Sequence, residues 1–135
     1  MHHNLLFDLD QTLLDFHASE HKALEIVLRA KGLHFSEEIR IYIVTNGATI
    51  NAKGRIATTG LDRYIDGVFV SEDMGVAKPD AAFFDICLER IGEPHETCIM
   101  IGDSLTSDML GAKNAGLESV WFMPAGRSSS CMTVL

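Results

Sequence analysis

The chain has 135 residues, of which 47% are hydrophobic and 22% charged, and its formal net charge at pH 7 is −8. This length fits one domain with its own core. No apolar run approaches the ~18 residues of a membrane span, and no basic stretch precedes the first apolar run, which argues against a signal peptide. The acidic balance argues against a nucleic-acid polymer or an anionic membrane as partner. Three cysteines without metal-type spacing suit a reducing compartment, so we expect a cytoplasmic protein.

Short apolar strands alternate with amphipathic helices along the predicted chain. In chain order we expect a strand at 4–9, a helix at 18–31, a strand at 41–44, a helix at 48–59, strands at 68–70 and 98–101 separated by a helix that starts at Pro79, a helix at 105–115 and a strand at 119–122. Because the strands are almost purely apolar, the pattern predicts an α/β domain whose parallel sheet is covered on both faces. Residues 1–123 would form this domain, and 124–135 an irregular tail.

Polar side chains follow the predicted strands at the edge where open α/β sheets bind ligands. Each has an ordinary explanation alone, since Asp is common in turns, Thr45 could cap a helix and Lys78 could be a solvated surface charge. Four carboxylates at one edge, however, repel one another and need a compensating cation, of which Lys78 supplies one charge. A hard divalent ion would supply the rest, and Mg²⁺ is the usual ion that also binds substrate phosphate. The residues concerned are Asp8, Asp10, Thr45, Lys78, Asp103 and Asp108.

Four segments resemble, in order, the four motifs of the haloacid dehalogenase (HAD) superfamily. They are Phe7-Asp8-Leu9-Asp10-Gln11-Thr12-Leu13, Val44-Thr45-Asn46-Gly47, Ala77-Lys78-Pro79-Asp80 and Gly102-Asp103-Ser104-Leu105-Thr106-Ser107-Asp108. The first motif alone would be a weak signal, but all four in order and at strand ends are specific. The resemblance covers nearly the whole chain apart from residues 16–40 and the tail. It is closest to the subfamily IA branch that contains bacterial pyrimidine 5'-nucleotidases, through residues 13–16, 70–73 and 115–117.

This resemblance implies a three-layer, Rossmann-like core with a five-stranded parallel sheet in the order 5-4-1-2-3. It also implies a Mg²⁺-dependent phosphomonoester hydrolase that forms an aspartyl-phosphate on Asp8, with Asp10 as general acid and base. The substrate would be a small phosphorylated metabolite, with nucleoside 5'-monophosphates as candidates. The implied supporting residues are Thr45, Lys78 and the backbone N–H groups around Leu9 and Asn46 for the phosphoryl oxygens; Asp8, the carbonyl of Asp10 and Asp103 for Mg²⁺; and Asp108, Thr12 and Ser104 around these.

The region between the first two motifs departs from the subfamily pattern. Relatives usually carry a helical cap of several tens of residues there, whereas residues 16–40 offer only the predicted helix 18–31. That helix is either the crossover of a capless core, which a parallel connection favours, or the remnant of a cap in a shortened form of a longer protein. Without a cap we expect weak selectivity among small phosphate esters. We also expect a homodimer in which Leu24, Val27, Leu28 and Phe35 contribute apolar surface.

Three other functions remain open or are disfavoured. A sugar-phosphate phosphatase or a phosphotransferase would share all four motifs, and the missing cap removes the segment that would distinguish them. A folded but inactive core could serve as an interaction module. A signalling receiver domain is disfavoured, because its phospho-acceptor follows the third strand, which here ends at Val70-Ser71.

Overall fold

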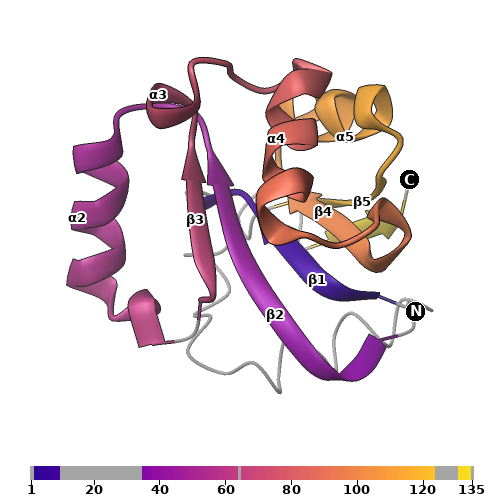
Figure 1. Ribbon diagram of the computed structural model, residues 1–135, viewed down its shortest axis with the longest axis horizontal. Helices are drawn as coiled ribbons and strands as arrows, with labels where there is room; N and C mark the ends of the chain where they lie inside the picture. The colour runs from indigo at the N-terminus through magenta and orange to yellow at the C-terminus, as the bar shows by residue number, and fades with distance from the viewer. Residues whose placement is uncertain (1, 10–34, 64, 124–130, 135) are drawn as a thin grey trace.

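The computed structural model describes residues 2–9, 35–63, 65–123 and 131–134 (Figure 1). Its strands are β1 (His2–Phe7), β2 (Phe35–Thr45), β3 (Gly67–Val70), β4 (Cys98–Gly102), β5 (Glu118–Met123) and β6 (Cys131–Val134). Its α-helices are α2 (Thr49–Thr59), α3 (Ser71–Met74), α4 (Ala81–Ile91) and α5 (Leu110–Ala115), and a π-helical turn, Leu105–Met109, leads into α5. No helix within the described ranges combines the length and the apolar content needed to span a membrane.

The six strands form one sheet in the order β3-β2-β1-β4-β5-β6. The first five are parallel to one another, which confirms the predicted five-stranded order. β6 pairs antiparallel with β5, from Val120–Val134 to Met123–Cys131. The prediction of an irregular tail over 124–135 is therefore wrong for Cys131–Val134. This segment is too short to show a strand period, and it follows a serine run that reads as a loop.

Alternate residues of the central strands pack into two separate cores, as expected for a sheet covered on both faces. Leu5 and Phe7 of β1 face the core that contains Ala52 and Ile56 of α2. Leu6 faces the opposite core, which is built with side chains of α4 and α5. Figure 1 shows α2 on one side of the sheet and α4 and α5 on the other. The second core also holds Cys87 and Cys98, and burial raises the pKa of the Cys87 thiol to about 12.

The helices depart from the predicted ones at α4 and at α3. α4 begins at Ala81, and the Asp80 side chain caps it by accepting a hydrogen bond from the Ala82 N–H at 2.9 Å. Pro79 therefore precedes the cap instead of occupying the first helical position, because the aspartate supplies the oxygen that a helix N-terminus needs. α3 was not predicted, since its four residues are too few to show a helical period. By contrast, α2 ends as expected at Gly60, whose φ of 75° is left-handed.

Several predictions fall on residues 10–34, outside the described part of the chain. They are the helix at 18–31, the choice between a crossover and a cap remnant, and the positions of Asp10 and Thr12. The proposed dimer surface depends on the same helix and on the side chain of Phe35, so it stays a prediction.

Candidate active site

The parallel register brings the C-terminal ends of β1, β2 and β4 together at one edge of the sheet. Phe7, the last residue of β1, is paired with Ile43 on one side and Ile101 on the other. The Asp8 N–H then donates a hydrogen bond to the Ile101 carbonyl at 3.0 Å, which extends the ladder by one residue. Asp8 thus lies between the loops that follow β2 and β4.

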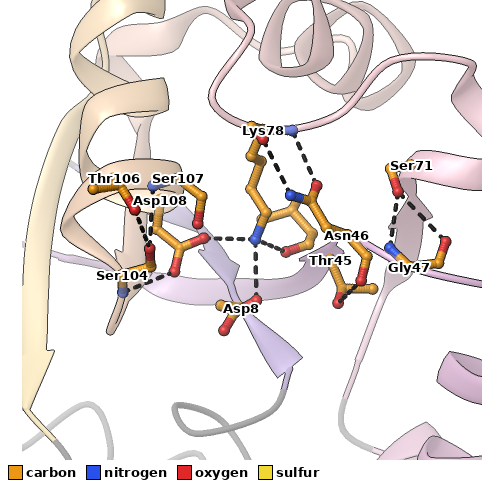
Figure 2. A network of polar contacts seen from close by, with 11 residues as sticks. Asp8, Thr45, Asn46, Gly47, Ser71, Lys78, Ser104, Thr106, Ser107 and Asp108 are labelled. Atoms are coloured by element: carbon orange, nitrogen blue, oxygen red, sulfur yellow. Dashed lines mark hydrogen bonds and ion pairs between the residues drawn. The ribbon is translucent and has the colours of Figure 1, made fainter.

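Lys78 lies at the centre of the site, with 5% of its surface exposed (Figure 2). Its ammonium group donates hydrogen bonds to Oδ1 of Asp108 at 2.6 Å, to the Val44 carbonyl at 2.8 Å and to Oδ1 of Asp8 at 3.0 Å. An ammonium group has three N–H donors, so the protein acceptors match all of them. The lysine is therefore a fixed positive charge that joins the ends of β1, β2 and the turn after β4.

Three carboxylates lie together at this edge, and Lys78 contacts two of them. Asp8, Asp103 and Asp108 each place an oxygen within 4.8 Å of the others, a grouping that can hold a metal ion. Their environments differ, since the Asp8 side chain is 17% exposed and that of Asp108 only 1%. Burial raises the pKa of the Asp108 carboxyl to about 6, which the neighbouring Lys78 ammonium opposes and the Asp8 charge reinforces. The described part of the site thus holds more negative than positive charge.

The turn after β4 fixes the acidic group in place. Oδ2 of Asp108 accepts a hydrogen bond from the Ser104 N–H at 3.2 Å, and Oγ of Ser104 accepts one from the Ser107 N–H at 3.1 Å. The Trp121 indole N–H donates to the Asp103 carbonyl at 2.9 Å and so ties this turn to β5. Ser104 therefore acts at this site by shaping the turn, and both oxygens of Asp108 are engaged by protein donors.

The remaining predicted residues, Asn46, Thr45 and Leu9, lie at the same edge but differ in what they can contact. The Asn46 side chain is hydrogen-bonded to the backbone of Lys78, and its own N–H meets no acceptor among the described residues. Thr45 is buried, and its hydroxyl donates to the Asn46 carbonyl at 3.3 Å. The Leu9 side chain belongs to the core on the α2 side, so only its backbone can serve the site.

Sequence reasoning missed the side chains that hold these groups from a distance. Asn46 and Asn114 contact the Lys78-Pro79 segment from positions 32 and 35 residues away, and no local pattern reveals such a contact. Gly102 did carry a signal, because a glycine at the end of a buried strand marks a close approach of another group. A Cβ atom at Gly102 would lie 2.6 Å from Cβ and Cγ of Asp108.

Gly102→Ala should therefore destabilise the protein by about 1–3 kcal/mol, because the new methyl group would push Asp108 away from Lys78. Gly54→Ala is the matched control, since Gly54 lies in α2 with nothing within 4 Å of the added atom. It should stabilise the protein by about 0.5–1 kcal/mol through helix propensity. Urea denaturation of both variants measures the difference. Equal stabilities would show that Asp108 can move freely.

The chain also matches known proteins. A family model described as haloacid dehalogenase-like hydrolase matches residues 22–116. The pyrimidine 5'-nucleotidase PynA of Streptococcus pneumoniae is 44% identical over 85 residues, which cover 62% of this chain and 36% of that protein. The pyrimidine 5'-nucleotidase YjjG of Escherichia coli is 43% identical over 83 residues, covering 61% of this chain and 37% of that protein. The chain thus spans little more than a third of the length of these curated relatives.

Among solved structures, the fold resembles that of Bacillus subtilis YfnB, which was crystallised bound to magnesium. The TM-score is 0.71 at 23% identity, and the alignment covers 95% of this chain and 91% of that one. This likeness supports the fold. The family model covers more than half of the chain, including three of the four motifs in full, and the fold agrees with it. The chain therefore belongs to the haloacid dehalogenase-like hydrolases.

Proposed function

We propose that this chain forms the catalytic core of a Mg²⁺-dependent phosphatase that cleaves phosphate monoesters through a phosphorylated Asp8. The observation that carries the proposal is the arrangement of Asp8 itself. Oδ1 of Asp8 accepts a hydrogen bond from Lys78, whereas no donor among the described residues contacts Oδ2. A partly exposed carboxylate that the described residues hold by one oxygen suits a nucleophile.

In the proposed reaction, Oδ2 of Asp8 attacks phosphorus while the bond from phosphorus to the leaving oxygen breaks. Asp10, whose role rests on the motif resemblance, gives its proton to that oxygen, and the alcohol leaves. Asp10 then takes a proton from water as the water oxygen attacks phosphorus. The bond between phosphorus and Asp8 breaks, inorganic phosphate leaves, and both carboxyl groups return to their starting forms.

The Lys78 ammonium can move one hydrogen bond from Asp8 to the phosphoryl group as the negative charge moves there. All three of its N–H groups have protein acceptors before substrate binds, so a phosphoryl oxygen has to replace one of these acceptors. Of its two carboxylate acceptors, Asp8 is more exposed than Asp108, and Asp8 loses its charge when the phosphate ester forms on it. The donor now on Asp8 can therefore shift to the phosphoryl group while those to Asp108 and Val44 stay in place.

The described carboxylates offer the oxygen ligands that Mg²⁺ prefers, and they lie close enough together to hold a metal ion. Asp8 and Asp103, with the carbonyl of Asp10, would hold the ion, because both Asp108 oxygens already accept hydrogen bonds from Lys78 and Ser104. When bound, Mg²⁺ would polarise a phosphoryl oxygen and offset the excess of negative charge. As substrates we propose pyrimidine nucleoside 5'-monophosphates, supported by the identity with two pyrimidine 5'-nucleotidases.

Removal of the metal should lower turnover of p-nitrophenyl phosphate and of uridine 5'-monophosphate by at least about 10²-fold, because Lys78 alone cannot balance a phosphate dianion. Asp103→Asn should cause a similar loss at saturating substrate. Asp85→Asn, at an exposed position of α4, is the control and should have no effect. Steady-state assays with Mg²⁺ and with excess chelator test this, and full turnover in chelator would refute the metal requirement.

A further inference from the structure

We infer that Asn46 is a positioning residue that acts through the Lys78 backbone, an inference that rests on the phosphatase activity proposed above. The Asn46 carboxamide makes two hydrogen bonds with one residue. Its Nδ2 donates to the Lys78 carbonyl at 3.1 Å, and its Oδ1 accepts from the Lys78 N–H at 3.0 Å. Figure 2 shows these bonds on the backbone of Lys78, away from the ammonium group.

A second asparagine holds the Lys78-Pro79 segment at Pro79. Nδ2 of Asn114, in α5, donates to the Pro79 carbonyl at 3.1 Å. Gly111, one turn earlier in α5, lets the segment approach closely, because a Cβ atom there would lie 3.1 Å from Cα of Pro79. The segment that carries Lys78 is therefore hydrogen-bonded on one side to the loop after β2 and on the other to helix α5.

The loop that carries Asn46 is itself anchored to α3. The Gly47 N–H donates to Oγ of Ser71 at 2.9 Å, and the same hydroxyl lies 3.4 Å from the Gly47 carbonyl. Two residues further along each segment, Oγ1 of Thr49 donates to Oδ1 of Asp73 at 2.8 Å. The loops after β2 and β3 thus form one unit, in which Asn46 has a defined position from which to hold Lys78.

The exposure of Asn46 distinguishes a positioning role in catalysis from a role in the stability of the fold. Asn46 is exposed and its two hydrogen bonds to Lys78 are only partly buried, so water can take the place of the carboxamide when the side chain is removed. The loss of Asn46 should therefore leave the fold nearly as stable. It should, however, release the backbone from which a buried ammonium reaches three acceptors, and an error of about 1 Å at a reacting centre can lower the rate by about 10²-fold.

The kinetic test compares Asn46→Ala with Asn51→Ala, an exposed asparagine of α2 for which no side-chain hydrogen bond is present in the described part of the chain. Asn46→Ala should lower kcat roughly 10- to 100-fold with a smaller change in KM and an unchanged unfolding temperature, and Asn51→Ala should match the wild type. In a Lys78→Met background, Asn46→Ala should lower kcat little further, because Asn46 acts through Lys78. If the double variant instead loses the product of the two single losses in kcat, the inference is overturned in favour of direct contact between Asn46 and substrate.

A second readout does not depend on turnover. In protein labelled with ¹⁵N-lysine, the Lys78 ammonium should give a slowly exchanging signal, assigned by its disappearance in Lys78→Met, because three acceptors protect its hydrogens. Asn46→Ala should accelerate that exchange at least several-fold, and Asn51→Ala should leave it unchanged. Unchanged exchange in Asn46→Ala would overturn the inference even if the enzyme is active. Accelerated exchange in a protein without phosphatase activity would support the positioning role and refute the proposed function alone.

Discussion

Asp8→Asn should reduce phosphatase turnover by about 10⁴-fold or more and leave the fold intact. An amide has nearly the shape of a carboxylate, but it cannot attack phosphorus and form a stable ester intermediate. The Asp8 side chain is 17% exposed, so water can solvate the substituted group. Rapid acid quenching with radiolabelled phosphate ester should trap a phosphoenzyme in the wild type and none in Asp8→Asn.

Asp85→Asn serves as the control for charge, because it removes one negative charge from an exposed position of α4. It should form the phosphoenzyme at the wild-type rate. A trapped phosphoenzyme in Asp8→Asn that survives removal of any deamidated fraction would place the nucleophile elsewhere.

Lys78→Met should have the largest effect on stability, a loss of about 3–5 kcal/mol near neutral pH, in addition to nearly complete loss of activity. Methionine fills a similar volume but leaves Asp108, which is 1% exposed, without its ion-pair partner. Urea denaturation in metal-free buffer measures the change. Lys53→Met, at an exposed position of α2, is the matched control and should alter the free energy of unfolding by less than about 0.5 kcal/mol.

The loss caused by Lys78→Met should depend on pH. Burial raises the pKa of Asp108 to about 6 in the presence of Lys78, and removal of the ammonium group raises it further. In the unfolded chain the carboxyl returns to its ordinary pKa of ~4. The folded state therefore binds the proton more tightly, and stability falls as pH rises from ~4 through the folded-state pKa. The deficit should be smallest near pH 4–5 and largest above pH 7. A deficit independent of pH would show that Asp108 is not the group left unpaired.

The sequence predicts the parallel core well because its strands are short apolar runs that end in polar residues. Val68–Val70 and Cys98–Ile101, for example, differ from β3 and β4 by one residue each. β2 begins at Phe35, further towards the N-terminus than predicted. The prediction missed this extension because Ser36-Glu37-Glu38 is polar and looks like a loop. Its pairing with β1 depends on a tertiary contact that no local pattern reveals. β6 and α3 escape prediction for the related reason that four residues show no period.

The sequence predicts those site residues whose position is determined by the end of a strand. The structure places Asp8 in contact with Lys78 and close to Asp103, because parallel strands bring their C-terminal ends to one edge. The depth of Asp108 could not be predicted, since it depends on Gly102 letting the carboxylate approach the strand. The role of the Asn46 side chain could not be predicted either, because its partner lies 32 residues away and is a backbone group.

The central position of β1 has a consequence for the synthesis of this protein. β1 needs two neighbours, and one of them, β4, lies far along the chain: Asn4 of β1 donates to Thr97, next to β4, across 93 residues. At about 5–20 residues per second, a ribosome makes that distance in roughly 5–20 s. During this interval β1, with apolar side chains on both faces, has one edge unpaired, and such an edge can pair with another chain. Asp8 is therefore made well before its acidic neighbours Asp103 and Asp108.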